Sequence, residues 1–247
     1  MLTIGARAKN VDEARICLEL GFPFLEVTLP CPGGRAEELG FARLVGDHGA
    51  FLLGHGPQEG NPADLDGLEH RYLPKLRQAL EQAAFLKAPA LTVHFWFESR
   101  WLSAEVIEGK IALLARAAAW GASLGVRVLV ENLSEAWPDL ARALDAVPGL
   151  GLTLDVGHAQ LLHPENQAPA IIENLFPRLG HLHLHDNCGG NSPKDDLHLI
   201  PGRGSVPFVR VFSALKSRGY AGTATLELAA DEMFEGREAV RAFWEAA

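Results

Sequence analysis

The sequence predicts an α/β protein that folds as a single (β/α)₈ barrel over residues 1–247. Three observations lead to this fold class. The length of 247 residues matches the roughly 250 that such a barrel needs. Short β-forming runs alternate with amphipathic helical runs along the whole chain, which is typical of parallel α/β folds. No Gly/Ser-rich linker or low-complexity tract divides the chain into smaller units.

Eight strands are expected, each a short run rich in apolar residues. They are residues 2–6, 23–28, 50–55, 90–95, 126–131, 150–155, 180–185 and 222–228. Between them, residues 11–20 show apolar positions near helical spacing and stop at Gly21, which suits the end of a helix. Ser103 is a suitable cap for a later helix. An open, doubly wound sheet is the alternative arrangement of the same elements.

Composition narrows the function classes. A net charge of −9 disfavours broad nucleic-acid binding, which needs Lys and Arg to displace counterions. The three cysteines are odd in number and are not spaced as a zinc knuckle, which indicates a reduced, cytoplasmic compartment. No apolar run approaches the ~20 residues of a membrane span, and the first residues resemble a strand rather than an export signal.

Residues able to bind metal recur at the carboxyl ends of the expected strands. Strand side chains alternate between two faces, so residues of one parity line the barrel interior. On this parity, strands end on carboxylates or imidazoles: Glu131, Asp155, Glu227, His55 and His94. The seventh strand carries three more on one parity: His181, His183 and His185. A lone Glu or His at a strand end is usually structural, but here the pattern repeats on six strands.

Such a crowd of acidic and imidazole groups is costly unless protons or cations compensate it. Divalent metal is the simplest compensation. The carboxyl ends of the strands are also where the active sites of (β/α)₈ barrels lie. The sequence therefore predicts a metal-binding active site at this edge of the barrel.

At these residues the sequence resembles the superfamily that joins xylose-isomerase-like sugar isomerases and epimerases with DNA-repair enzymes of the endonuclease IV type (AP endonuclease family 2). The likeness covers essentially the whole chain. The segments that carry it are Val130-Glu131-Asn132, Leu154-Asp155-Val156-Gly157-His158, His183-Leu184-His185-Asp186, Asp196-Leu197-His198 with Gly202-Arg203-Gly204, and Leu226-Glu227.

The resemblance implies one to three metal ions. A central ion, shared by both branches, would be held by Glu131, Asp155, His183 and Glu227. The endonuclease-like branch binds two further ions. Their ligands match His55, His94 and a bridging Glu131 for one, and His158, Asp196 and His198 for the other. Mixed imidazole and carboxylate ligands suit zinc or manganese better than calcium.

Sugar or sugar-phosphate isomerisation or epimerisation is the chemistry that we favour from the sequence. Metal would polarise the substrate carbonyl, with Glu131 and Glu227 as the pair that transfers protons. The candidates for substrate binding are His158, Arg203 and Trp96. Arg203 suits a phosphate or hydroxyl group, or is an exposed loop arginine. Trp96, with Phe95 and Trp101, forms either an apolar wall for a sugar ring or ordinary helix packing.

The alternative is a zinc phosphodiesterase that acts on abasic DNA or on a small phosphoester. The full set of nine ligand positions favours it, because clustered metals lower the pKa of bridging water. The endonuclease pattern has His-Pro-Gly where His94 precedes Phe95-Trp96-Phe97, and no basic stripe for DNA is present. A non-catalytic binder is a third interpretation, which the intact Glu131 and Glu227 oppose. Related isomerases often pair or form tetramers, so the resemblance also implies a homo-oligomer.

Overall fold

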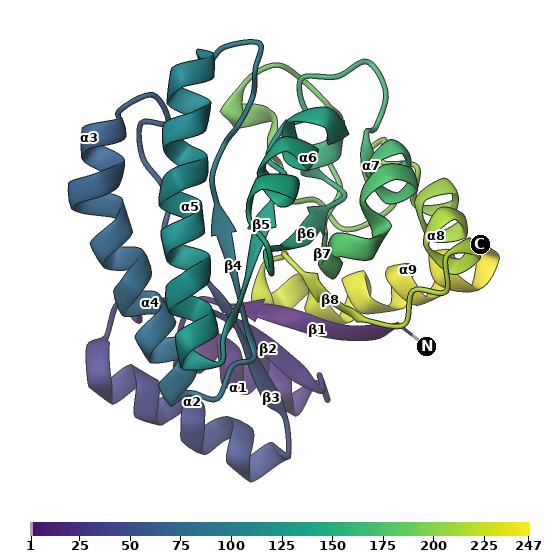
Figure 1. The fold of residues 1–247 in the computed structure, drawn as a ribbon. Helices are drawn as coiled ribbons and strands as arrows, with labels where there is room; N and C mark the ends of the chain where they lie inside the picture. Colours follow the sequence, from purple (N-terminus) through teal and green to yellow (C-terminus); the bar gives the residue numbers. More distant parts are fainter. Residues whose placement is uncertain (1) are drawn as a thin grey trace.

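The computed structural model describes residues 2–247 and shows a closed parallel barrel of eight strands in the order β1 to β8 (Figure 1). Each strand pairs with its sequence neighbour. β8 closes the ring on β1, in a register from Thr3 opposite Thr223 to Ala6 opposite Leu226. This closure confirms the predicted (β/α)₈ barrel and excludes the open doubly wound sheet.

The strands lie where the sequence predicts them, with each end displaced by no more than two residues. They are β1 (Thr3–Ala8), β2 (Phe24–Thr28), β3 (Phe51–His55), β4 (Ala90–His94), β5 (Arg127–Glu131), β6 (Gly151–Asp155), β7 (Leu179–Leu184) and β8 (Thr223–Leu226). Four of them end on a residue that the parity argument singles out as metal-capable: His55, His94, Glu131 and Asp155.

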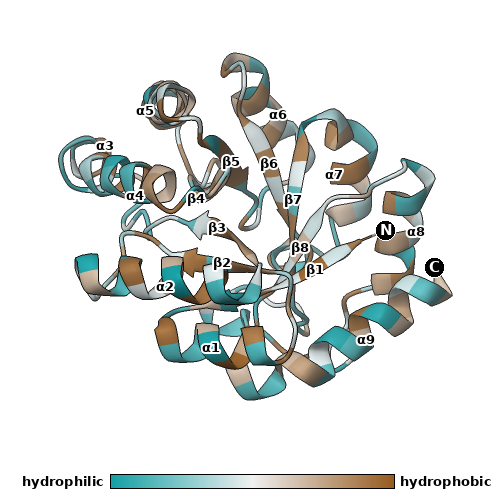
Figure 2. Ribbon diagram, turned by 90° about the horizontal axis from the view of Figure 1, so that it is seen from below, coloured by the Kyte–Doolittle hydropathy of each residue, from teal (hydrophilic) through white to brown (hydrophobic). Residues whose placement is uncertain are grey.

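Helices surround the strands, as the view along the barrel in Figure 2 shows. They are α1 (Val11–Glu19), α2 (Gly34–His48), α3 (Leu65–Gly67), α4 (Leu73–Phe85), α5 (Ala104–Leu124), α6 (Trp137–Ala146), α7 (Ala168–Leu175), α8 (Phe208–Ser217) and α9 (Met233–Ala246). Ser103 caps α5 by accepting a hydrogen bond from the Val106 amide, as predicted. Gly21, just beyond α1, takes a positive φ of 80°, which glycine adopts without strain. No helix within residues 2–247 is long and apolar enough to cross a membrane.

The two faces of the barrel wall are packed differently. Outward-facing residues such as Leu25, Val27 and Val93 are fully buried beneath the helices. Inside, Phe24 fills the amino-terminal half so closely that a Cβ on Gly5 would lie 2.4 Å from its ring. With that end filled by side chains, the remaining interior space opens at the carboxyl ends of the strands.

Candidate metal centre and substrate pocket

One cavity of about 570 Å³ opens at the carboxyl ends of the strands. This volume lies within the range typical of small-molecule sites. Its wall combines apolar side chains such as Trp96 and Leu162 with the predicted metal-binding residues His55, Glu131 and Glu227. The predicted site and the cavity therefore coincide.

Four residues from four strands converge beneath this cavity and form the central group: Glu131, Asp155, His183 and Glu227. His183 Nδ1 lies 3.2 Å from Glu131 Oε1, 3.5 Å from Glu227 Oε1 and 3.9 Å from Asp155 Oδ2. All four residues are buried. The alternation of side chains along a strand explains this convergence, since each residue has inward parity at or next to the end of its strand.

Two atoms of the central group are buried without a hydrogen-bond partner within residues 2–247. They are Glu131 Oε1 and His183 Nδ1, which face each other without hydrogen-bond geometry. Leaving buried polar atoms unsatisfied costs about 1–3 kcal/mol each. A divalent cation bound between them would satisfy both, so the residues fit a metal ion.

A first side group consists of His55, His94 and Glu131. His94 Nε2 lies 3.0 Å from Glu131 Oε2, and His55 Nε2 lies 3.6 Å from the same oxygen. Glu131 thus directs Oε2 to this group and Oε1 to the central group. A carboxylate placed in this way is suited to bridge two cations, as the sequence resemblance implies.

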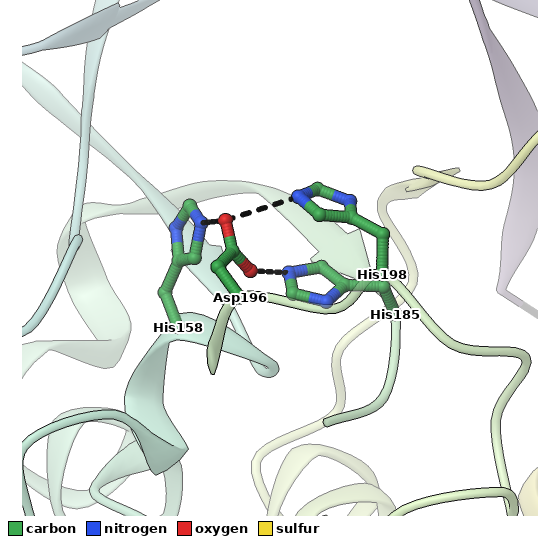
Figure 3. A group of neighbouring side chains, drawn as sticks. All are labelled: His158, His185, Asp196 and His198. Carbon is green, nitrogen blue, oxygen red and sulfur yellow. Dashed lines mark hydrogen bonds and ion pairs between the residues drawn. The ribbon is translucent and has the colours of Figure 1, made fainter. Parts of the chain in front are cut away.

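A second side group consists of His158, Asp196 and His198, shown in Figure 3. Asp196 Oδ2 lies 3.2 Å from His158 Nε2 and 3.2 Å from His198 Nε2. The second carboxylate oxygen, Asp196 Oδ1, is buried and has no hydrogen-bond partner within residues 2–247. His158 follows β6, whereas Asp196 and His198 lie in the long loop after β7.

The imidazoles of all three groups share one further feature. Each of the five predicted ligands directs one nitrogen into its group, and its other nitrogen lies 2.9–3.3 Å from an oxygen outside the predicted coordinating atoms. These oxygens are Gly56 O for His55, Gln58 Oε1 for His94, Asn132 O for His158, a Glu26 carboxylate oxygen for His183 and Glu227 O for His198. Such an outer partner fixes tautomer and ring orientation and is typical of metal-ligating histidine.

Glu26 has a role that the sequence only partly indicates. Its buried carboxylate lies 3.0 Å from His183 Nε2 and 3.1 Å from His181 Nε2, and accepts a 2.7 Å hydrogen bond from Thr225 Oγ1. The residue is fully buried, so its carboxylate packs against His183 and does not line the cavity. It therefore orients an imidazole that is a candidate metal ligand, and its inward parity on β2 is the only sequence signal for this.

His185 is a member of the site to which the sequence assigns no role. Its Nε2 lies 3.1 Å from Asp155 Oδ1 and 3.8 Å from Asp196 Oδ1, and its ring stacks on His198 at 3.9 Å (Figure 3). Unlike the five predicted ligands, its outer nitrogen Nδ1 has no hydrogen-bond partner within residues 2–247. We therefore interpret it as a donor that links the central and second side groups. Gly157 leaves room for it, since a Cβ there would lie 2.2 Å from the ring.

Imidazole and carboxylate groups of the site shift each other's pKa values. Burial alone would lower the pKa of His183, but the surrounding carboxylates, led by Glu26, raise it well above its usual value. Burial likewise opposes the charge on His198, yet the bond to Asp196 raises its pKa to about 9. Burial would raise the pKa of Glu227, but His183 and other cationic neighbours lower it to about 2. A cation bound among these groups would compete with the protons that they hold.

Of the substrate-binding residues expected from the sequence, some line the cavity in the structure and others do not. Trp96 lines the cavity, donates from Nε1 to Ser134 Oγ at 2.8 Å and stacks on Trp101 at 5.7 Å. His158 also lines it. Phe95 is fully buried and packs against Tyr72. It therefore contributes to helix packing and does not line the cavity.

Arg203 lies outside the cavity, contrary to the role expected for it. Its guanidinium donates to Glu235 at 2.7 Å and is about half exposed. The reason is local: the amides of Gly202 and Gly204 turn inward to the Asp186 carboxylate, at 2.8 and 2.9 Å, and the side chain between them faces outward. The arginine that does line the cavity is Arg7, on β1, which is not among the residues predicted from the sequence.

Comparison with known proteins places this chain in a family. The sequence model of the xylose isomerase-like TIM-barrel family matches residues 14–244. The chain belongs to this family. Among relatives of the family, the fructoselysine 3-epimerase of Shigella flexneri is 24% identical over 260 aligned positions, which cover 96% of this chain and 92% of that protein.

Other similar proteins extend the comparison. The uncharacterized protein MJ1311 of Methanocaldococcus jannaschii is 26% identical over 181 residues, and the match covers 68% of this chain but only 60% of that protein's length. A solved structure described as a D-tagatose 3-epimerase-like protein superposes with a TM-score of 0.84 at 21% identity, covering 98% of this chain and 97% of that one. At this identity the structural likeness establishes the fold.

Proposed function

We propose that this protein is a divalent-metal-dependent isomerase or epimerase of a small sugar or sugar derivative. The observation that carries the proposal is the placement of Glu131 and Glu227. They approach His183 Nδ1 from β5 and from the end of β8, at 3.2 and 3.5 Å. Two carboxylates on different strands beside one cation site are the arrangement needed to move a proton from one face of a carbon to the other.

We assign a different role in this reaction to each residue of the site. A divalent ion in the central group would supply Lewis-acid polarisation of the substrate oxygens next to the reacting carbon. Glu227 is placed to accept the proton and Glu131 to return one, since both carboxylates lie beside the central cation site. Glu26 holds the His183 ring, and we assign substrate contacts to His158 and Trp96 in the cavity wall.

Two further observations support this proposal. The fructoselysine 3-epimerase and the D-tagatose 3-epimerase-like protein named above are described by sugar epimerase names, and both align along almost the whole chain. The cavity of about 570 Å³ is of a size that suits a monosaccharide derivative.

Solvent deuterium exchange tests the proposal directly. Mn²⁺-loaded protein would be incubated in D₂O with a panel of ketoses, and NMR would follow deuterium at the carbon next to the carbonyl. We expect exchange with at least one sugar, and its loss in Glu131→Gln and in Glu227→Gln. Glu108→Gln serves as a matched control, since Glu108 is exposed on α5 and pairs with Arg142. Exchange that persists in both site variants would refute the assigned roles.

The second candidate function is metal-dependent phosphodiester hydrolysis. It is favoured by one observation: both side groups are assembled around the central group, each with its outer hydrogen bonds in place. Metal analysis separates the two functions. Two or three tightly held zinc ions per chain, with nicking of duplex DNA at an abasic site, would support hydrolysis. A single Mn²⁺ or Co²⁺ requirement without nicking would support isomerisation.

A further inference from the structure

A mostly buried arginine lies in the cavity wall, and the proposed reaction gives it no role. Arg7 is on β1 with inward parity, opposite Glu26 in the neighbouring strand, and its side chain is 11% exposed. A guanidinium keeps its charge at every accessible pH. A permanent positive charge therefore faces the cavity beside the metal-binding groups.

Arg7 is held in one orientation. Its Nη1 donates to Glu26 O at 3.1 Å, its Nη2 donates to Thr28 Oγ1 at 3.0 Å, and its Nε lies 3.6 Å from Glu227 Oε1. A guanidinium has five N–H donors, of which these contacts use at most three. Two donors, one on each terminal nitrogen, thus have no acceptor within residues 2–247. A fixed guanidinium with free terminal donors is suited to bind a carboxylate or phosphate.

The position of Arg7 limits where such an oxyanion would sit on the substrate. Arg7 Nε and His183 Nδ1 approach the same oxygen, Glu227 Oε1, at 3.6 and 3.5 Å. Arg7 therefore lies directly beside a carboxylate oxygen of the central group. An oxyanion bound by Arg7 belongs close to the reacting carbons.

The charges around the cavity favour the same conclusion. Within residues 2–247 Arg7 forms one ion pair, with Glu227 Oε1 at 3.6 Å, and Glu227 is also a predicted ligand of the central cation. Lys9, which is exposed at the rim on the same side of the barrel, lines the cavity and adds a second positive charge. Both would attract an anionic substrate.

Resting on the isomerase or epimerase function proposed above, we propose that the substrate is an anionic sugar, and that Arg7 binds its oxyanion next to the carbons that exchange a proton. The oxyanion is a carboxylate or a phosphate. Arg7 thereby determines specificity for charged over neutral sugars.

Calorimetric titration of the Mn²⁺-loaded protein with three probes tests the proposal. The probes are D-fructose, which is neutral, 2-keto-D-gluconate, which carries a carboxylate beside its carbonyl, and D-fructose 6-phosphate. We expect at least one anionic probe to bind about 10- to 100-fold more tightly than D-fructose. The preferred anion distinguishes a carboxylate site from a phosphate site. Arg7→Gln should remove this advantage, so that the anionic probes bind no more tightly than D-fructose does. Equal affinities for all three probes, or an equal loss for all three in Arg7→Gln, would overturn the proposal.

Two variants sharpen the test. Arg7→Lys keeps the charge but loses the paired donors, so it should retain only a small part of the anion preference; it also serves if Arg7→Gln fails to fold. Arg203→Gln removes an arginine outside the cavity and should keep the full preference. Loss of the preference in Arg203→Gln, or its full retention in Arg7→Lys, would contradict the assignment. Deuterium exchange reports on the reaction, whereas this titration reports on binding, so the two proposals fail separately.

Discussion

At the scale of single residues, the site depends on carboxylates whose two oxygens contact different groups. Glu131 directs one oxygen to His94 and the other to His183, and so joins two groups. Asp155 Oδ2 faces His183 Nδ1 at 3.9 Å, whereas its Oδ1 accepts a 2.7 Å hydrogen bond from the His158 amide. Because the groups share carboxylates, substitutions in the central group and in the side groups should have different consequences.

The substitutions Asp155→Ala and Asp196→Ala distinguish the central group from the second side group. Asp155→Ala removes a ligand of the central group and should abolish both the central ion and activity. Asp196→Ala should empty only the second side group and leave an isomerase partly active. Metal analysis of the purified variants, together with the exchange assay, checks both outcomes. Full activity and metal content in Asp155→Ala would show that the ligand assignment is wrong.

Metal affinity should depend on pH, because cations replace protons in this site. His158 and His183 have pKa values raised well above the usual value by neighbouring carboxylates, and that of His198 is raised to about 9. At neutral pH the ion-free site thus holds protons that a cation must displace, so affinity should rise with pH up to about 9. Calorimetry in buffers of different ionisation enthalpy should reveal proton release. Heats that do not depend on the buffer would contradict this protonation scheme.

At the scale of elements, the loop after β7 is organised by one carboxylate. Asp186 is fully buried and accepts hydrogen bonds from the amides of Asn187, Val206, Gly202 and Gly204 at 2.8–3.0 Å. These bonds fold the chain back on itself, and the loop so closed carries Asp196 and His198 to the cavity. A Cβ on Gly204 would lie 2.3 Å from Asn187 O, so glycine is required where the loop returns.

Asp186→Asn should therefore disturb the second side group indirectly, by loosening the loop that carries Asp196 and His198. An amide keeps one acceptor oxygen and places an NH₂ group against backbone donors, which should lower the free energy of unfolding by about 3 kcal/mol. Affinity for an ion held by Asp196 and His198 should fall as well. Chemical denaturation and metal titration measure the two effects, with the exposed Asp145→Asn on α6 as a control. Wild-type stability in Asp186→Asn would contradict this account of the loop.

The strands and the loops differ in how far the sequence predicts them. Strand alternation is a local rule, so the inward direction of Glu131, His94 and Asp155 is predictable from the sequence alone. The direction of Arg203 is not, because it depends on which backbone amides Asp186 captures. The roles of Arg7 and His185 are hidden as well: their parity is readable, but their contacts come from neighbouring strands and from the loop after β7.

At the scale of the whole molecule, closure of the barrel explains why the site forms. Residues far apart in the chain, such as Glu26 and Thr225, hydrogen-bond at 2.7 Å only because β8 pairs with β1, which in turn pairs with β2. The fold class and the central group are predictable because both follow from the strand pattern. The substrate is not predictable in this way, since the cavity wall is built largely from loops.

The overall charge of −9 leads to a prediction about partners. Few basic side chains face the cavity, so little counterion release is available to drive binding to a duplex. We expect no saturable binding to duplex DNA below about 100 µM protein at about 0.15 M salt. Fluorescence anisotropy with labelled DNA, plain or with an abasic site, measures this. Tight binding to the abasic duplex would favour the hydrolase alternative.

The central claim is that Glu131, Asp155, His183 and Glu227 hold one divalent cation. Anomalous diffraction from crystals grown with Mn²⁺ and measured near the manganese absorption edge tests it most directly. We predict a peak within about 2.0–2.3 Å of a ligand atom from each of the four residues. A well-ordered crystal with no peak there, or with these four side chains pointing apart, would contradict the account.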